Sequence, residues 1–428
     1  MKKIPIFILL LSALLFSQVN RRNRPIKGPL PLLFDKIFFS ELITSNQDNN
    51  QNYFIYKVPA NRLIFQKDNE VYKANFTVSL EFLDEKQNIV QRKYDEKFVE
   101  VDSYEKTKSM DDYVEGVIQI DFGNNIKRII PTFTDLNNER AIKGKQINLI
   151  DNGDKLFSTP IIVKNNLVEC DDVDAYEIAN YGGDIPFSES KYTLLLPSND
   201  LDNDELFVKI ISNNDTLYNS SITNYFDATI NIKYCNDKIV LLKDDDISNS
   251  RFYILENFDE KLSEGAFKLV VSNNSDFKNY TTFIKRVIWF DKPFSLRNPE
   301  HAIKYLNFIE EDSVIDKILD NDSFQYSKLL QKYWKKFDPT SNTTFNPIMK
   351  EYYERIDYST IHFMPISRKS GATTDRGKIY IKYGKPNEIK RTSNTYGQVT
   401  EIWIYNNSKK EFVFIDKYGI GDFSLITG

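Results

Sequence analysis

Histidine is scarce in this chain, with only His301 and His362 among 428 residues. Neither belongs to an HExxH pattern or lies near a cysteine, and both fall in segments predicted to be helical. A histidine zinc site or a Ser-His-Asp triad is therefore not supported, because each needs histidine beside its partner residues. No glycine-rich loop has the spacing of a phosphate-binding or dinucleotide-binding motif. We therefore expect no cofactor and no metal ion.

The chain also lacks an excess of charge of one sign. It carries 56 Lys and Arg against 61 Asp and Glu, a net charge of -5, and no basic stripe is present. A nucleic-acid partner is not expected, because such proteins concentrate positive charge on one face. Asp200, Asp202 and Asp204 resemble the start of a calcium loop, but Glu205 and Ile211 occupy the positions that need Gly and Glu. This segment is predicted to be an acidic surface turn.

Long hydrophobic runs are missing except at the start. Lys2 and Lys3 precede an apolar run at residues 4–16, which is shorter than the ~20 residues that a membrane span needs. Ser17 offers a small residue for cleavage, so residues 1–17 are interpreted as a signal peptide, with a retained N-terminal anchor as the alternative. Residues 18–30 form a polar, basic tail that is predicted to be flexible. We expect an exported protein, in the periplasm or outside the cell.

Cysteine is limited to Cys170 and Cys235. In an exported chain these two residues permit one disulfide, and the alternative is two buried free thiols. The bond requires Cα atoms less than ~7 Å apart. On the chain-entropy model it would stabilise the fold by roughly 4 kcal/mol.

Aromatic residues make up 14% of the chain, mostly Phe and Tyr, which favours strands. Residues 72–82 alternate strictly between apolar and polar, so that all six apolar side chains fall on one face of a strand. Similar short strands follow, separated by Asn and Asp residues that accept turn conformations. We predict two antiparallel β-sandwich domains, at residues 31–152 and 153–292.

The apolar period changes to that of helices after residue 292. Asn298 with Pro299, and Asn346 with Pro347, are typical pairs at the start of a helix. Residues 293–320 are predicted to be a helical linker, and residues 321–428 an α+β domain. Its strands are expected at 378–383, 401–405, 411–416 and 423–426, with helices packed on one face of this small antiparallel meander. The fold class is therefore mainly β and multidomain, with a C-terminal α+β domain.

Several motifs follow one another in this last domain. Trp334 precedes Asp338 and Pro339, and Arg355 lies in the next predicted helix. The other motif residues are Gly371, Thr374, Asp375, Arg376, Gly377, Tyr380, Tyr383, Gly384, Pro386, Glu401, Trp403, Tyr405, Phe412, Phe414, Asp416, Gly419, Gly421 and Asp422. As an ordered set, they resemble the GWxTD domain family, a C-terminal module of exported bacterial proteins. The resemblance implies export and β domains ahead of the module, but no particular activity.

Ala372 stands where the name-giving motif of that family has tryptophan. If the tryptophan were a surface anchor for a partner, this chain has lost it. If it were part of the core, its loss would cost ~3–5 kcal/mol unless Phe363 or Met364 filled the space.

Asp375, with Arg376 and Thr374, is the most polar cluster in the module. A catalytic interpretation makes Asp375 a general base, with Glu401 or Asp416 as a second carboxylate. A structural interpretation makes it a turn residue that accepts backbone hydrogen bonds and pairs with Arg376 or Arg355, while Gly377 supplies a positive φ.

Two functions follow from these interpretations. The first is a non-enzymatic interaction or scaffold protein of the bacterial cell envelope, whose partner is an envelope protein or glycan. The alternative is a hydrolase of cell-envelope glycan or peptide that uses Asp375 and Glu401. In the first case Asp375, Arg355 and Trp403 are structural. The outer face of the meander, carrying Tyr380, Trp403, Tyr405 or their neighbours, would then be the interface.

Overall fold

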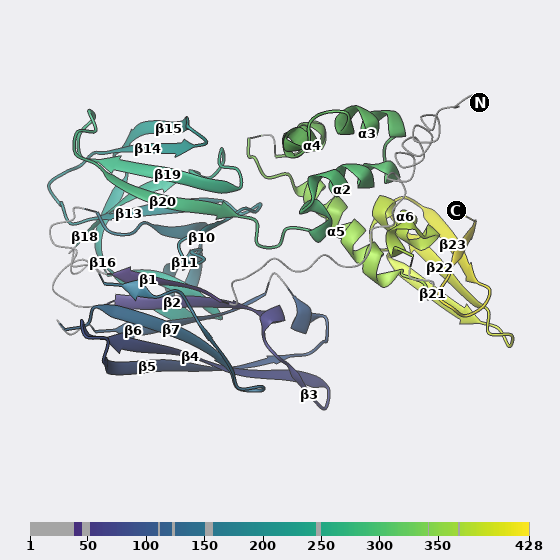
Figure 1. The fold of residues 1–428 in the computed structure, drawn as a ribbon, viewed down its shortest axis with the longest axis horizontal. Coiled ribbons are helices and arrows are strands. Elements are labelled where there is room, and N and C mark those ends of the chain that lie inside the picture. Colours follow the sequence, from purple (N-terminus) through teal and green to yellow (C-terminus); the bar gives the residue numbers. More distant parts are fainter. Residues whose placement is uncertain are drawn as a thin grey trace, which may run out of the picture. The chain divides into compact units, whose positions relative to one another are not determined.

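The computed structural model describes residues 38–44, 52–109, 112–121, 125–149, 157–244, 250–340, 342–366 and 369–427. The chain is mainly β, with several antiparallel sheets and a C-terminal region of helices and a small meander (Figure 1). It forms two compact units: a β unit, Phe34–Asp291 with Thr340–Phe345, and a C-terminal unit, Lys292–Pro339 with Asn346–Gly428. The predicted signal peptide and tail lie outside the described residues.

The first part of the β unit is a sandwich of two antiparallel sheets. One sheet has the order β1-β2-β6, and the other has the order β3-β4-β7-β8, with β5 beside β4 and β9 beside β7. The bounds are β1 Phe39–Thr44, β2 Asn52–Pro59, β3 Gln66–Asp68, β4 Val71–Leu83, β5 Ile89–Val101, β6 Tyr113–Ile120, β7 Arg128–Asp135, β8 Arg140–Lys143 and β9 Ile147–Asn148. The alternating segment at 72–82 lies in β4. Its side chains Phe76 and Leu80 are fully buried and belong to the same core as Phe54 and Tyr56 of β2.

Strand β2 is buried along its whole length. Phe54 and Tyr56 face the core of the sandwich, whereas Tyr53 and Ile55 on the other face pack into a second core with β10, β11, β13, β16, β17 and β18. The three-stranded sheet is therefore a layer shared by two cores. This sharing explains why the two predicted β domains form one compact unit.

The second part of the β unit contains two further sheets. Six strands form a closed barrel in the order β10-β11-β17-β16-β18-β13, and five form a sheet in the order β12-β20-β19-β14-β15. The bounds are β10 Ile161–Cys170, β11 Val173–Ile178, β12 Ile185–Pro186, β13 Tyr192–Ser198, β14 Leu206–Ser212, β15 Asp215–Ile222, β16 Tyr225–Cys235, β17 Lys238–Asp244, β18 Ser250–Glu256, β19 Gly265–Ser272 and β20 Thr281–Ile288. In Figure 1 the strands β10 and β13 lie between this five-stranded sheet and the strands β1 and β2.

Asn and Asp residues close the tight hairpins of this region. Asp171–Asp172, Asn213–Asn214 and Asn236–Asp237 are two-residue turns in which every φ is positive, between 49° and 70°. Such turns match the twist of the strands that they join, and Asn and Asp tolerate this conformation.

The C-terminal unit begins with short helices. Its helices are α2 Pro299–Lys304, α3 Asp312–Leu319, α4 Tyr326–Trp334, α5 Pro347–His362 and α6 Asp375–Tyr383. Asn298 and Asn346 cap α2 and α5 by accepting hydrogen bonds from backbone N–H groups, as their sequence positions predict. Residues 293–320 are more than a linker, because Tyr353 of α5 donates a hydrogen bond to the carbonyl of Ala302, at 2.8 Å.

A four-stranded antiparallel meander completes this unit. Its strands are β21 Glu388–Ser393, β22 Val399–Tyr405, β23 Lys410–Asp416 and β24 Ser424–Thr427, paired in this order. The strand predicted at 378–383 is wrong, because these residues belong to helix α6. Thr374 caps the start of α6, and Gly384 ends it with a φ of 77°. The core under the meander joins Trp403 and Phe414 to Ile379 and Tyr380 of α6.

Candidate functional site

The GATTDRG segment, residues 371–377, forms the 3-10 turn Gly371–Thr373 and the first turn of α6. A Cβ on Gly371 would lie 2.1 Å from the carbonyl oxygen of Ser359. A Cβ on Gly377 would lie 2.0 Å from the carbonyl oxygen of Gly371. Both glycines are therefore required for close approach of backbones. The prediction that Gly377 supplies a positive φ is wrong, because Gly377 is helical.

Thr374 and Asp375 hold the start of α6. The Thr374 hydroxyl donates to the carbonyl of Gly371 at 2.6 Å and accepts from the N–H of Gly377 at 3.1 Å. Asp375 lies in the first turn, where a carboxylate is stabilised by the helix dipole. Its Oδ2 accepts a hydrogen bond of 2.9 Å from the N–H of Leu425, which fixes β24 to the helix.

Arg376 and Glu401 form a buried ion pair at the centre of the site. Arg376 Nη1 lies 3.1 Å from Glu401 Oε2, and the two side chains are 13% and 8% exposed. The Trp403 indole N–H donates to the same Glu401 oxygen at 3.3 Å. The Arg376 guanidinium also lies 3.8 Å from the centre of the Phe423 ring. Burial lowers the pKa of Arg376, and the charge of Glu401 opposes that shift.

The predicted pairing of Asp375 with Arg376 or Arg355 is wrong. Arg376 pairs with Glu401, and Arg355 pairs with Glu351 one helical turn earlier in α5. The cation nearest to Asp375 is Lys378, at 4.0 Å.

Asp416 organises the loop between β23 and β24. It is 2% exposed and accepts hydrogen bonds from the N–H groups of Tyr418, Ile420 and Gly421, the last at 2.7 Å. Gly419 and Gly421 both have positive φ values, 67° and 79°, which glycine adopts without strain. Asp422, the last residue of this motif, is exposed.

Ala372 is fully buried, with 0% of its surface exposed. The position of the motif tryptophan therefore belongs to the core in this chain, which fits the second interpretation of the substitution. Phe363 packs in the neighbouring core, whereas Met364 is 45% exposed.

The remaining motif residues join the helices to this core. Trp334 is 3% exposed, and its carbonyl accepts from the side chain of Asn346 at 2.9 Å, which links the ends of α4 and α5. Asp338 ends the 3-10 turn after α4, and Pro339 beside it is exposed. Gly384 packs on the Arg355 guanidinium, which lies 3.1 Å from where its Cβ would be. Pro386 is buried beyond the end of α6.

The aromatic residues assigned to the outer face of the meander lie elsewhere. Trp403 and Tyr405 are 1% and 5% exposed and face the core, and Tyr380 is on α6 rather than on a strand. Strand alternation turns the neighbours of Trp403 to the opposite face. The outer patch, as we call it, is formed there by the partly exposed Thr400, Ile402, Ile404, Val413 and Ile415. Ile402 lies directly across from Val413 in the sheet.

The two carboxylates of the hydrolase hypothesis have separate partners. Asp375 is partly exposed and bonded to a backbone N–H, and Glu401 is buried against Arg376. A catalytic carboxylate must be available to a substrate, whereas Oε2 of Glu401 is held by Arg376 and the Trp403 indole inside the fold. Glu401 is therefore suited to holding Arg376 in place.

The cysteines of the β unit form a disulfide. Cys170 and Cys235 have Cα atoms 6.1 Å apart and are bonded to each other. Each residue comes directly before a two-residue turn, so the bond joins the tips of the β10–β11 and β16–β17 hairpins. Among the described residues, Cys170, Asp171 and Cys235 form the only group of three or more His, Cys, Asp or Glu side chains close enough together to hold a metal ion. The two sulfur atoms of this group are already bonded to each other.

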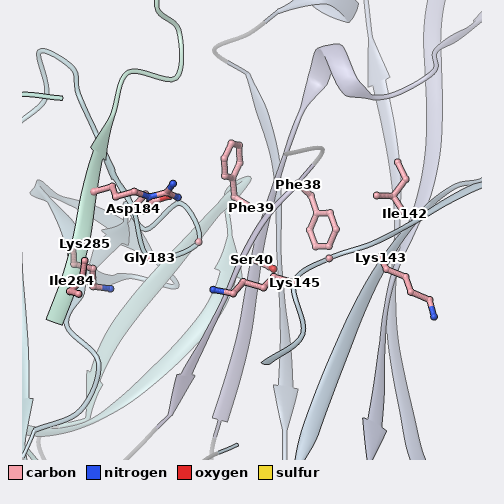
Figure 2. Close-up of a pocket in the computed structure, with 13 residues that line it drawn as sticks. Phe38, Phe39, Ser40, Ile142, Lys143, Lys145, Gly183, Asp184, Ile284 and Lys285 are labelled. Carbon is pink, nitrogen blue, oxygen red and sulfur yellow. Dashed lines mark hydrogen bonds and ion pairs between the residues drawn. The ribbon is translucent and has the colours of Figure 1, made fainter. Parts of the chain in front are cut away.

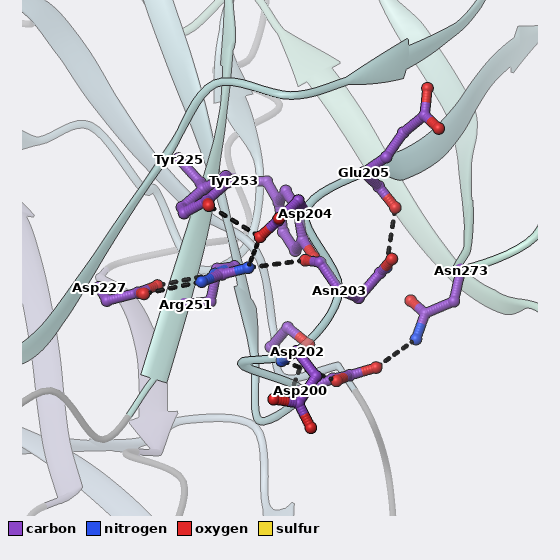
Figure 3. A network of polar contacts seen from close by, with 11 residues as sticks. Asp200, Asp202, Asn203, Asp204, Glu205, Tyr225, Asp227, Arg251, Tyr253 and Asn273 are labelled. Atoms are coloured by element: carbon purple, nitrogen blue, oxygen red, sulfur yellow. Dashed lines mark hydrogen bonds and ion pairs between the residues drawn. The ribbon is translucent and has the colours of Figure 1, made fainter.

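The acidic turn at residues 200–205 is tied down by the β unit itself (Figure 3). Arg251, whose side chain is 6% exposed, lies 2.7 Å from Asp204 and 2.8 Å from Asp227. Hydrogen bonds from Tyr225 and Arg251 lower the pKa of Asp204. Asp200 accepts a hydrogen bond from Asn273. These carboxylates therefore serve the fold.

Residues 270–421 match the family model of the GWxTD domain, which confirms the resemblance found in the C-terminal region. No curated protein matches the chain. Within the described residues, no helix combines the length and apolar character needed to cross a membrane.

Proposed function

We propose that this chain is an exported, non-enzymatic interaction protein of the bacterial cell envelope. In this proposal the C-terminal unit binds a protein partner through the outer patch of its meander, and the β unit serves as a rigid carrier.

The observation that carries the proposal is the use of the motif's polar groups inside the fold. Glu401 pairs with Arg376, Asp416 accepts three backbone N–H groups, and Thr374 caps α6. A catalytic site instead requires acid, base or nucleophile groups that converge on a substrate. The motif therefore supports a structural role, and binding is assigned to a different surface.

The outer patch supports a protein as the partner. Ile402, Ile404, Val413 and Ile415 place four aliphatic side chains on adjacent strands, opposite the face that holds Trp403. Apolar side chains grouped on one face of a sheet in this way are typical of protein–protein interaction sites. Small-molecule sites, in comparison, are concave and combine apolar walls with a few precisely placed polar groups.

The disulfide supports export. Structural disulfides are rare in reducing compartments and persist in the periplasm and outside the cell. The apolar run at residues 4–16, after Lys2 and Lys3, would supply the export signal.

Site-specific photocross-linking in cells tests the proposal. A photoreactive amino acid at Ile402 is expected to give a discrete cross-linked protein band. The matched control places the photoreactive amino acid at Ile366, which is 74% exposed and lies in the same unit but outside the sheet. This control is expected to give no cross-linked band. Equal labelling at both positions, or no band at Ile402, would contradict the assignment of the patch.

A further inference from the structure

A cavity of about 590 Å³ lies in the β unit, far along the chain from the motif residues (Figure 2). One side is formed by Phe38, Phe39 and Ser40 at the start of β1, and by residues 142–145 at the end of β8. The other side is formed by the turn at residues 182–184 and by residues 284–286 of β20. Its volume falls within the range of small-molecule sites in proteins.

The turn at Gly182 and Gly183 brings the two sides together. Both glycines have positive φ values, and a Cβ on Gly182 would lie 3.1 Å from the carbonyl oxygen of Ser40. A Cβ on Gly183 would lie 3.6 Å from the Lys285 ammonium. The backbone of this turn therefore borders the cavity without a side chain that would fill it.

Two of the basic residues lining the cavity are neutralised by carboxylates. Lys285, whose side chain is 8% exposed, lies 3.3 Å from Glu41. Arg286 makes two hydrogen bonds to Asp184, one of them 3.0 Å long. These pairs keep two cations in fixed positions on one side of the cavity.

Lys143 and Lys145 add positive charge from the other side. Both are exposed, and neither has an ion-pair partner within 4 Å among the described residues. In Figure 2 the Lys145 side chain extends toward the side that carries Gly183 and Lys285, whereas Lys143 points away from it. The lining therefore has an excess of two positive charges, one of which is directed inward.

We propose that this cavity binds a small organic ligand carrying an oxyanion, either a carboxylate or a phosphate. Lys145 supplies the charge that pairs with the oxyanion, and Lys285 lies on the opposite side of the same space. Partly exposed Ile142 and exposed Ile284 offer apolar contact to the rest of the ligand. This site is independent of the proposed protein-binding patch.

Calorimetric titration of the full mature protein at constant ionic strength tests this inference, with citrate and inorganic phosphate as probes. Saturable binding of at least one probe is expected, and the tighter probe identifies the oxyanion as carboxylate or phosphate. Lys145→Gln should weaken that binding at least tenfold. Lys143→Gln removes the same charge two residues away and should change it less than twofold.

Melting temperatures measured without probe establish that both variants are folded, as expected for exposed lysines without ion pairs. Absence of saturable binding of either probe to the wild-type protein would overturn the inference. Equal weakening by the two substitutions would overturn it as well, because it would show attraction by general surface charge alone.

Discussion

At the scale of single residues, Arg376 and Glu401 form a buried ion pair in the C-terminal unit, with side chains that are 13% and 8% exposed. Replacing Glu401 with Gln removes one charge and leaves the Arg376 guanidinium buried without its counter-ion. Breaking such a pair on one side costs about 3–5 kcal/mol. We expect a loss of this size in the free energy of unfolding of the Glu401→Gln variant, measured by urea denaturation.

The double variant Arg376→Met with Glu401→Leu is the matched control, because it removes both charges while keeping similar volumes. Its stability should lie closer to the wild type than that of Glu401→Gln. If the single variant is as stable as the wild type, the pair does not have the structural role assigned here.

Asp357 in α5 makes the stability of the C-terminal unit depend on pH. It accepts hydrogen bonds from the N–H groups of Phe294 and Ser295, but burial outweighs them and raises its pKa to about 7. The folded state therefore binds a proton more tightly than the unfolded state. The contribution of protonated Asp357 to the free energy of unfolding is complete below the pKa that Asp357 has in the unfolded chain. This contribution is lost as pH rises through about 7.

We therefore expect the melting temperature of the full protein to fall between pH 5 and pH 8. Asp357→Asn should reduce this slope, because the amide does not titrate. A smaller slope should remain from Asp259 of the β unit, whose pKa burial raises to about 6. An unchanged slope in the variant would show that Asp357 does not cause the dependence.

The pairing predicted for the charged residue Asp375 of the motif is wrong at both of its proposed partners. Asp375 and Arg376 are adjacent in the chain, which favoured a local pair. In the structure the helix directs Arg376 toward Glu401 of β22, 25 residues away, and Asp375 toward the backbone of β24. Such pairings depend on how elements pack, which the local pattern does not contain.

At the scale of elements, helix α6 shows the limit of short apolar patterns. KIYIKY alternates with a period of two and predicts a strand, but six residues do not separate this period reliably from that of a helix. The deciding features lie at its ends, where Thr374 caps the helix and Gly384 ends it. The strands β22 and β23 were predictable because each places alternate aromatic residues on one face.

The contact between α6 and the preceding 3-10 turn predicts that a Gly→Ala substitution in this helix lowers stability instead of raising it. Gly→Ala at an interior helix position normally stabilises by about 1 kcal/mol. Gly377→Ala should instead destabilise by about 1–3 kcal/mol or more, because the new Cβ meets the backbone of Gly371. Urea unfolding of this variant measures the effect.

Lys378→Ala changes the next residue of the same helix, which is exposed, and serves as the control. Its stability should stay within about 0.5 kcal/mol of the wild type. A Gly377→Ala variant that is more stable than the wild type would show that the close contact does not exist.

At the scale of the whole molecule, the shared sheet of β1, β2 and β6 makes the β unit one body. The sequence of β2, NYFIYKVP, shows little alternation because both faces are buried. This pattern was available in the sequence, but it does not reveal which second sheet covers the outer face. The boundary predicted at 152/153 consequently separates two halves that share buried side chains.

The disulfide connects this unit to the proposed location of the protein. We expect alkylation of denatured extracts from cells producing the protein to find Cys170 and Cys235 oxidised, with no reactive thiol. The Cys170→Ala/Cys235→Ala variant should lose up to roughly 4 kcal/mol of stability. Quantitative alkylation of both cysteines in cells would argue against an oxidising compartment.

The central claim is that the motif builds the C-terminal unit while the outer patch binds the partner. The most direct measurement uses the partner protein that cross-linking at Ile402 identifies. It compares how much of this partner is recovered with affinity-tagged Asp375→Asn and Ile402→Glu variants, and it includes the melting temperature of each variant. We expect near wild-type recovery for Asp375→Asn, because the helix-dipole effect of Asp375 is only about 0.3–1 kcal/mol. We expect at least tenfold lower recovery for Ile402→Glu at an unchanged melting temperature. Loss of recovery in a folded Asp375→Asn protein, with normal recovery for Ile402→Glu, would contradict the central claim.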